Sequence, residues 1–145
     1  MRERERVPGQ RVVGVAIISV LATSGELMPS FPFTVTLGAS SLGTNPLAGW
    51  QYEYNPYEKA AVSLMVNTAG ASASVQLQVT SGSQTIQQRG PVQAGGTAGV
   101  TPSSLNTQPI TWIAGKGDRL IVSLDETAAA TPVVNGLIEI EPAVL

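Results

Sequence analysis

Cysteine and histidine are both absent from the 145 residues of the sequence. Without cysteine the chain forms no disulfide bonds, so the rigidity of the fold must come from packing and hydrogen bonding. Zinc sites built from cysteine and histidine are excluded. Catalysis by a Ser-His-Asp triad or a Cys-His pair is excluded as well, because each needs a residue type that the chain lacks.

Charged side chains are scarce too. They make up 12% of the residues, about half of the usual ~25%. The hydrophobic content is ordinary at 43%, and small or uncharged polar residues replace the missing charges. A surface so poor in charge is expected where other subunits cover most of it; the alternative is a neutral β-domain that stands alone. The net charge of −2 provides no basic field for nucleic acid, so nucleic acid is an unlikely partner.

The few cations are unevenly placed, because half of the eight lie in the first eleven residues: Arg2, Arg4, Arg6 and Arg11. Residues 12–145 hold the other four cations against eight acids, a net charge of −4. Residues 1–10 have nothing to bury, and we interpret them as an extended N-terminal arm. We expect the four arginines to contact a neighbouring copy; disorder and contact with nucleic acid are the alternatives.

A hydrophobic run long enough to span a membrane as a helix is missing at the N-terminus. Residues 12–22, VVGVAIISVLA, form an apolar run of eleven residues, which is too short for such a span. Its length also fits the core of a secretory signal, but Glu3 and Glu5 interrupt the positive start that such a signal needs. The many β-branched residues favour a buried strand instead.

No stretch of the sequence shows sustained helical spacing of apolar residues, whereas alternation typical of strands recurs along the chain. The clearest case is residues 73–80, in which alanine, valine and leucine alternate with serine, glutamine and threonine. The expected strands span residues 12–22, 33–37, 50–54, 60–67, 72–80, 84–89, 109–113, 119–124 and 133–141.

Short strands at such regular spacing predict an all-β fold, an antiparallel β-sandwich or barrel. The long connections favour a jelly-roll-like arrangement over a simple meander. Residues 90–108 form a 19-residue stretch rich in glycine, proline, serine and threonine, and a loop of that length usually serves a function. We expect one sandwich domain over residues 11–145, preceded by the arm at 1–10.

Aromatic residues are few, and four of the seven lie close together: Trp50, Tyr52, Tyr54 and Tyr57. If residues 50–54 form a strand, alternation places the first three rings on one face. Core or subunit-interface packing is the common use of such rings, so we take the four as candidate inter-subunit contacts. A platform that stacks sugars is the alternative, which would make the chain a carbohydrate-binding module.

The acidic residues form no catalytic pattern. Asp118 lies in a glycine-rich turn, a usual place for aspartate. Glu139 and Glu141 are two residues apart and therefore share one solvent-facing side of a strand, whereas a paired-carboxylate hydrolase needs carboxyls that face each other across a cleft. A calcium site made by Asp125, Glu126 and loop carbonyls is an alternative, although it lacks EF-hand spacing.

Glycine-rich segments also fail to indicate a nucleotide site. Residues 95–99 lack the Gly-Lys-Ser/Thr sequence of a phosphate-binding loop, and residues 115–118 precede a strand rather than a helix. We therefore expect no enzyme activity, no catalytic residues, no cofactor and no metal ligands.

The C-terminal third combines a Gly-Asp-Arg-Leu-Ile-Val-Ser-Leu strand, a connection of small residues and a closing Val-Asn-Gly-Leu-Ile-Glu-Ile-Glu-Pro strand. From Ala60 onward the chain resembles the small β-sandwich decoration or cement proteins of tailed bacteriophage heads. The resemblance lies in composition and strand style over about 85 residues, and no functional residue carries over.

That resemblance implies a non-enzymatic virion protein that self-associates, commonly as a homotrimer, and binds a major capsid protein on the outer surface of the head. Such a protein is made in the host cytoplasm and strengthens the shell against internal pressure. A minor capsid, collar or tail role is the alternative within the virion, and no membrane is involved.

Overall fold

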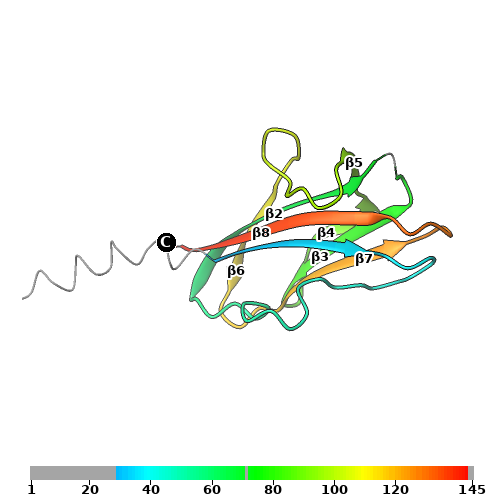
Figure 1. Cartoon of the computed structure of the whole chain (residues 1–145). Helices are drawn as coiled ribbons and strands as arrows, with labels where there is room; N and C mark the ends of the chain where they lie inside the picture. Colours follow the sequence, from blue (N-terminus) through cyan, green and yellow to red (C-terminus); the bar gives the residue numbers. More distant parts are fainter. Residues whose placement is uncertain (1–28, 71, 144–145) are drawn as a thin grey trace, which may run out of the picture.

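The structure is a computed structural model that describes residues 29–70 and 72–143. These residues form two packed β-sheets and no helix (Figure 1). The first sheet has the order β1 (Ser30–Thr36), β8 (Val133–Pro142) and β2 (Lys59–Ala69). Along the other edge of β2, its first half pairs with β6 (Ile110–Gly115) and its end pairs with β5 (Gln93–Gly96). The second sheet consists of β4 (Gln84–Pro91), β3 (Val75–Ser81) and β7 (Leu120–Glu126).

The chain crosses repeatedly from one sheet to the other, so most neighbouring strands are distant in sequence; β3 and β4, which follow one another, are an exception. β1 pairs antiparallel with β8, β8 with β2, and β3 with β7. An isolated bridge between Thr44 and Leu124 adds the β1–β2 connection to the free edge of β7. If this segment is counted as a fourth strand of the second sheet, and β5 and β6 are counted as one position beside β2, each sheet has four strand positions. Their order is that of a jelly roll. The predicted all-β sandwich of jelly-roll type is therefore confirmed.

The core lies between the two sheets, and alternation along each strand determines which side chains enter it. Val62 and Leu64 of β2 and Ile138 and Ile140 of β8 point inward and are buried. The β3 and β7 residues that face them are equally buried: Val75, Leu77, Val79, Leu120, Val122 and Leu124. The alternation expected for residues 73–80 is confirmed in β3, and Glu139 and Glu141 share the solvent-facing side of β8 as expected.

Two predictions about secondary structure are wrong. Residues 50–54 form turns rather than a strand, because the Trp50 N–H bonds the Leu47 carbonyl and the Glu53 N–H bonds the Trp50 carbonyl. These turns direct Trp50 and Tyr52 onto the edge of the core, which a straight strand would not do. The stretch 90–108 is not wholly a loop, because β4 continues to Pro91 and β5 follows at once. The arm at 1–10, the strand at 12–22 and the domain boundary between them lie outside the described residues.

Candidate functional site

The exposed edges of the sandwich are poorly suited to pairing with another strand. β4, at one edge of the second sheet, has two register shifts against β3, and such bulges break a regular ladder of hydrogen bonds. β1, at one edge of the first sheet, contains Pro32, which has no N–H to donate. The edge of β7 is occupied, because the Thr44 and Leu124 backbones exchange two hydrogen bonds. The edges therefore disfavour strand pairing with a partner, and the sheet faces are better suited to contact with one.

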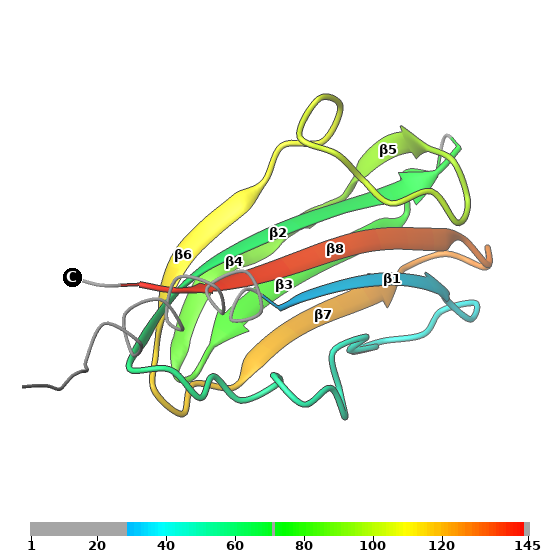
Figure 2. The same ribbon diagram turned by 60° about the vertical axis from the view of Figure 1, so that its left-hand side comes forward.

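One half of the outer face of the first sheet is covered by the connection between β5 and β6 (Figure 2). The amide of Asn135 on β8 holds this connection, since it donates to the Thr97 carbonyl at 3.1 Å and accepts from the Gly99 N–H at 3.0 Å. Asn135 also donates to the Asn67 side chain, which in turn donates to the Thr107 hydroxyl. Both asparagines are buried as a result.

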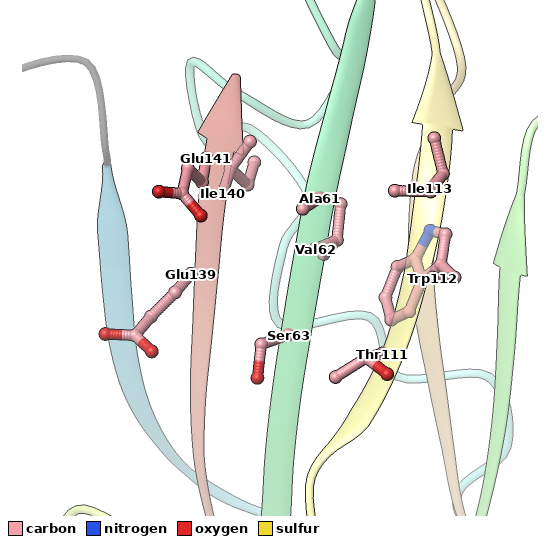
Figure 3. Close-up of a pocket in the computed structure, with 9 residues that line it drawn as sticks. All are labelled: Ala61, Val62, Ser63, Thr111, Trp112, Ile113, Glu139, Ile140 and Glu141. Carbon is pink, nitrogen blue, oxygen red and sulfur yellow. The ribbon is translucent and has the colours of Figure 1, made fainter. Parts of the chain in front are cut away.

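The other half of this outer face is open and forms a trough of about 360 Å³. Its floor consists of two small side chains of β2, Ala61 and Ser63, which are flanked by larger side chains on both neighbouring strands (Figure 3). Residues of β8 form one wall and residues of β6 form the other: Glu139 and Glu141 on β8, Thr111 and Ile113 on β6. The hollow exists because the short side chains of Ala61 and Ser63 are paired, on both neighbouring strands, with residues that have longer side chains.

The two walls of the trough differ in chemistry. On the apolar side, Ile113 is 49% exposed, a large exposure for an isoleucine in a strand. On the acidic side, Glu139 and Glu141 are exposed and form no ion pair or side-chain hydrogen bond within residues 29–70 and 72–143. Lys59, exposed on the same face at the end of β2, forms no ion pair with either glutamate. The trough thus offers apolar contact along one side and unneutralised negative charge along the other.

The predicted aromatic contacts are placed differently from the expected platform. Trp50 stacks on Phe31 of β1 at 5.1 Å, and Tyr52 lies edge-on to Trp50 at 5.4 Å. Tyr57 stacks on Tyr52 at 6.4 Å, and burial raises the pKa of its hydroxyl, with a further contribution from Tyr52. These rings form one row that closes the side of the sandwich and packs against the core.

Tyr54 is separate from that row and 57% exposed. Its ring lies beneath the Arg119 guanidinium, whose Nε donates to the Glu53 carboxylate at 2.7 Å. Glu53 also accepts a hydrogen bond from the Gly49 N–H at 3.0 Å, and this bond and Arg119 together lower the pKa of the Glu53 carboxyl. The group fixes the turn at residues 49–54 onto the start of β7.

Three further acidic residues, Asp118, Asp125 and Glu126, are used within the fold. Asp118 accepts hydrogen bonds from the Gly115 N–H and the Ser81 hydroxyl. Asp125 binds the Arg89 guanidinium and the Gly43 N–H on the outside of the second sheet, whereas Glu126 is fully buried on the inside. Adjacent residues of a strand point to opposite faces. The pair that the calcium alternative needs is therefore separated, and that alternative is wrong.

Within the part of the chain that the structure describes, no group of three or more acidic side chains is placed to hold a metal ion. Over the same residues no helix has the length and apolar character required to cross a bilayer. The four arginines expected at an interface, Arg2, Arg4, Arg6 and Arg11, lie outside the described residues.

The trough was not identified from the sequence. The sequence places Glu139 and Glu141 on one solvent face, but it does not show that β8 pairs with β2 or that β2 pairs with β6. The sequence feature that indicates the trough is the pair of small residues Ala61 and Ser63, which lie on the face of the strand away from the buried Val62. Small outward-facing residues in a central strand leave space, and only the strand order shows what surrounds that space.

No protein-family model and no curated protein matches the chain. Among solved structures, it is similar to a chain from the disulfide-linked pili that form Bacillus endospore appendages. The TM-score is 0.47 and the identity 13%, over 81% of this chain and 88% of that one. It is also similar to a chain of the virus-like particle of the extra small virus of the giant freshwater prawn Macrobrachium rosenbergii. That comparison gives a TM-score of 0.30 and 12% identity, over 100% of this chain and 90% of that one. Both TM-scores are below 0.5, so neither likeness assigns a property to this chain.

Proposed function

We propose that this protein is a non-enzymatic structural protein that associates with copies of itself, and that the trough on β2, β6 and β8 is a contact surface. The observation that carries this proposal is the open hollow itself. An apolar wall and a small-residue floor, bordered by polar groups, are the features of a protein interaction site. Covering such a surface contributes about 2.5 kcal/mol for each 100 Å² of apolar area removed from water.

The scarcity of charge supports the same proposal. Four cations and seven acids lie in the described residues, and two of the cations, Arg89 and Arg119, are already in ion pairs. A surface with so few ions loses little hydration energy when another subunit covers it. The outer positions of β3, such as Gln76 and Gln78, are also uncharged.

The more specific proposal is a virion protein that decorates the outside of a bacteriophage head, forms a trimer and binds a major capsid protein. It is supported by the resemblance of the C-terminal strands, which correspond to β7 and β8 and pack in the two different sheets. Minor capsid, collar and tail roles remain alternatives within the virion. Sedimentation of the protein together with its source particle tests this location, and recovery of all of the protein apart from any particle contradicts it.

The carbohydrate alternative is not favoured by the geometry of the aromatic row. A sugar stacks on an open ring face, whereas Trp50 is stacked on Phe31 and Tyr52 is stacked on Tyr57. Tyr54, the remaining ring of the expected platform, is separate from this row, and its ring lies beneath the Arg119 guanidinium.

Self-association is tested by a charge placed on the trough floor. Ala61→Arg keeps the inward-facing side of β2 intact but fills the hollow, and we expect the dissociation constant of the assembly to rise at least about tenfold. The matched control is Gln76→Arg, which adds the same charge on the outer face of the second sheet and should leave assembly unchanged. Native mass spectrometry and sedimentation velocity measure both. A wild-type protein that stays monomeric at high concentration contradicts the proposed function.

A further inference from the structure

We propose that the trough is the binding site for residues 12–22 of a neighbouring copy of this chain, with Arg11 beside Glu139 and Glu141. This inference rests on the proposed function, since it names the partner segment of the same surface. Copies would then be linked by exchange of their N-terminal segments.

The apolar character of the trough fits this segment. Residues 12–22 contain no charged residue, and nine of the eleven are valine, isoleucine, leucine or alanine, side chains suited to contact with an apolar sheet face. Opposite the floor of Ala61 and Ser63, a side chain such as Ile17 or Ile18 has space to enter, and the exposed Ile113 provides an apolar neighbour. A glutamine-rich surface such as the outer face of β3 offers no comparable contact.

The charges favour the same occupant. Residues 1–11 carry four arginines and two glutamates, a net charge of +2. The described residues carry four basic and seven acidic side chains, a net charge of −3. Two such bodies repel each other, whereas the arm of one copy is attracted to the acidic wall of another. Glu139 and Glu141 are free to accept it, because neither has an ion-pair partner within the described residues.

The position at which the segment joins the fold is also suitable. The Pro29 carbonyl accepts a hydrogen bond from the Ile140 N–H, so the chain enters the sandwich beside the acidic wall of the trough. Residues 23–28 separate this point from the apolar segment, and six extended residues span about 20 Å. That reach covers the width of several strands at about 4.8 Å each. A copy that meets its neighbour near this wall can therefore deliver residues 12–22 to the neighbour's trough.

The absence of cysteine allows a direct test by disulfide trapping in the full-length chain. One protein carries Ile113→Cys and a second carries Ile17→Cys, with Ile18→Cys as a companion that samples the opposite face of an extended segment. The two proteins are co-expressed, oxidised and analysed by peptide mass spectrometry. We expect a link between position 113 of one copy and position 17 or 18 of the other. Gln76→Cys, on the outer face of β3, replaces Ile113→Cys as the control and should give at least about tenfold less linked product.

The outcomes separate this inference from the proposed function. A link between copies at position 113 supports the inference. A chain that carries both cysteines and links only within itself overturns it, because the segment then occupies its own trough. An assembly that stays intact by native mass spectrometry but forms no link also overturns it, while self-association stands. A monomer under all conditions contradicts both.

A charge exchange gives a second and independent test. Arg11→Glu and the double change Glu139→Lys with Glu141→Lys should each weaken assembly about threefold to tenfold, in the range of partly exposed ion pairs. Combining all three should restore much of the loss if the groups meet, and a simple sum of the two losses contradicts the contact.

Discussion

Asn135 is a fully buried amide on the outer face of β8, where a hydrophobic side chain would be the usual occupant. Its side chain donates to Asn67 and to the Thr97 carbonyl and accepts from the Gly99 N–H. A buried amide with these partners is stable, and it holds a glycine-rich connection that has little apolar surface of its own.

Replacing this amide should therefore release the connection. We expect Asn135→Ala to lower the free energy of unfolding by about 2–4 kcal/mol, because the Thr97 carbonyl and Gly99 N–H lose their partner. Urea denaturation measures the loss, and limited proteolysis should show earlier cleavage within residues 97–107. Gln88→Ala, on the exposed face of β4, is the control and should change stability by less than about 0.5 kcal/mol. Equal effects of the two changes contradict the anchoring role.

Glu53 gives the stability of the fold a dependence on pH. Its pKa is lowered in the folded state by the Gly49 N–H and by Arg119. A group with a lowered pKa stabilises the fold above its ordinary value, about 4.3, and that contribution is lost as the pH falls through the lowered value.

We expect the loss of unfolding free energy caused by Glu53→Gln to be largest near about pH 7 and to shrink as the pH falls through the lowered pKa of the wild-type carboxyl. Urea titrations at several pH values measure the difference. Glu58→Gln is the control, because Glu58 is exposed and makes no side-chain hydrogen bond within the described residues. A difference between wild type and Glu53→Gln that stays constant over this pH range would refute the expectation.

At the scale of a single element, β8 is the strand on which the first sheet is built, because it pairs with β1 on one side and β2 on the other. Its inner face includes Gly136, which is directly opposite Phe33 in the register. A Cβ at Gly136 would lie 2.1 Å from the Phe33 ring. The glycine is required by close packing, so that the ring can cover the strand.

Gly136→Ala should destabilise the fold by about 3 kcal/mol, because the ring cannot move far in a close-packed core. Gly90→Ala in β4 is the matched control, since its new Cβ would meet nothing nearer than the Gln88 carbonyl at 3.8 Å. Thermal and urea denaturation measure both. In the double variant Phe33→Leu with Gly136→Ala, the two losses should be less than additive; fully additive losses would show that the contact is not the cause.

At the scale of the whole molecule, the two sheet faces and the edges have different chemistry. The bulges of β4, Pro32 of β1 and the bridge at Thr44 limit pairing at the edges. The outer face of β3 is polar and uncharged, and the connection between β5 and β6 covers half of the other outer face. The trough on β2, β6 and β8 remains open, and we propose that copies of the protein associate there.

If arginines of the arm meet Glu139 and Glu141, assembly should weaken as salt is added. We expect the dissociation constant to rise several-fold between about 0.05 M and about 0.5 M salt, because the Debye length shortens over that range. Sedimentation velocity measures it. The double variant Glu139→Gln with Glu141→Gln should start weaker and respond less to salt. An equal salt response in this variant would mean that the two glutamates take no part.

Local properties of the sequence determined most of the secondary structure. Alternation at residues 73–80, 119–124 and 133–141 predicted strands, and at 73–80 it also predicted the buried face, because side-chain direction in a strand depends on position alone. The aromatic segment could not be read this way. Trp50 stacks on Phe31, a residue nineteen positions earlier, and Tyr52 lies edge-on to Trp50; no local pattern encodes the contact with Phe31.

The sequence by itself therefore determined an all-β, cysteine-free, charge-poor chain with a basic start and an acidic body. Tertiary structure alone decided that β8 lies between β1 and β2, that Asn67 and Asn135 meet, and that Ala61 separates Glu141 from Ile113. The physical reason is that composition and alternation act within a strand, whereas a surface hollow is made by side chains of three strands whose order depends on long-range pairing.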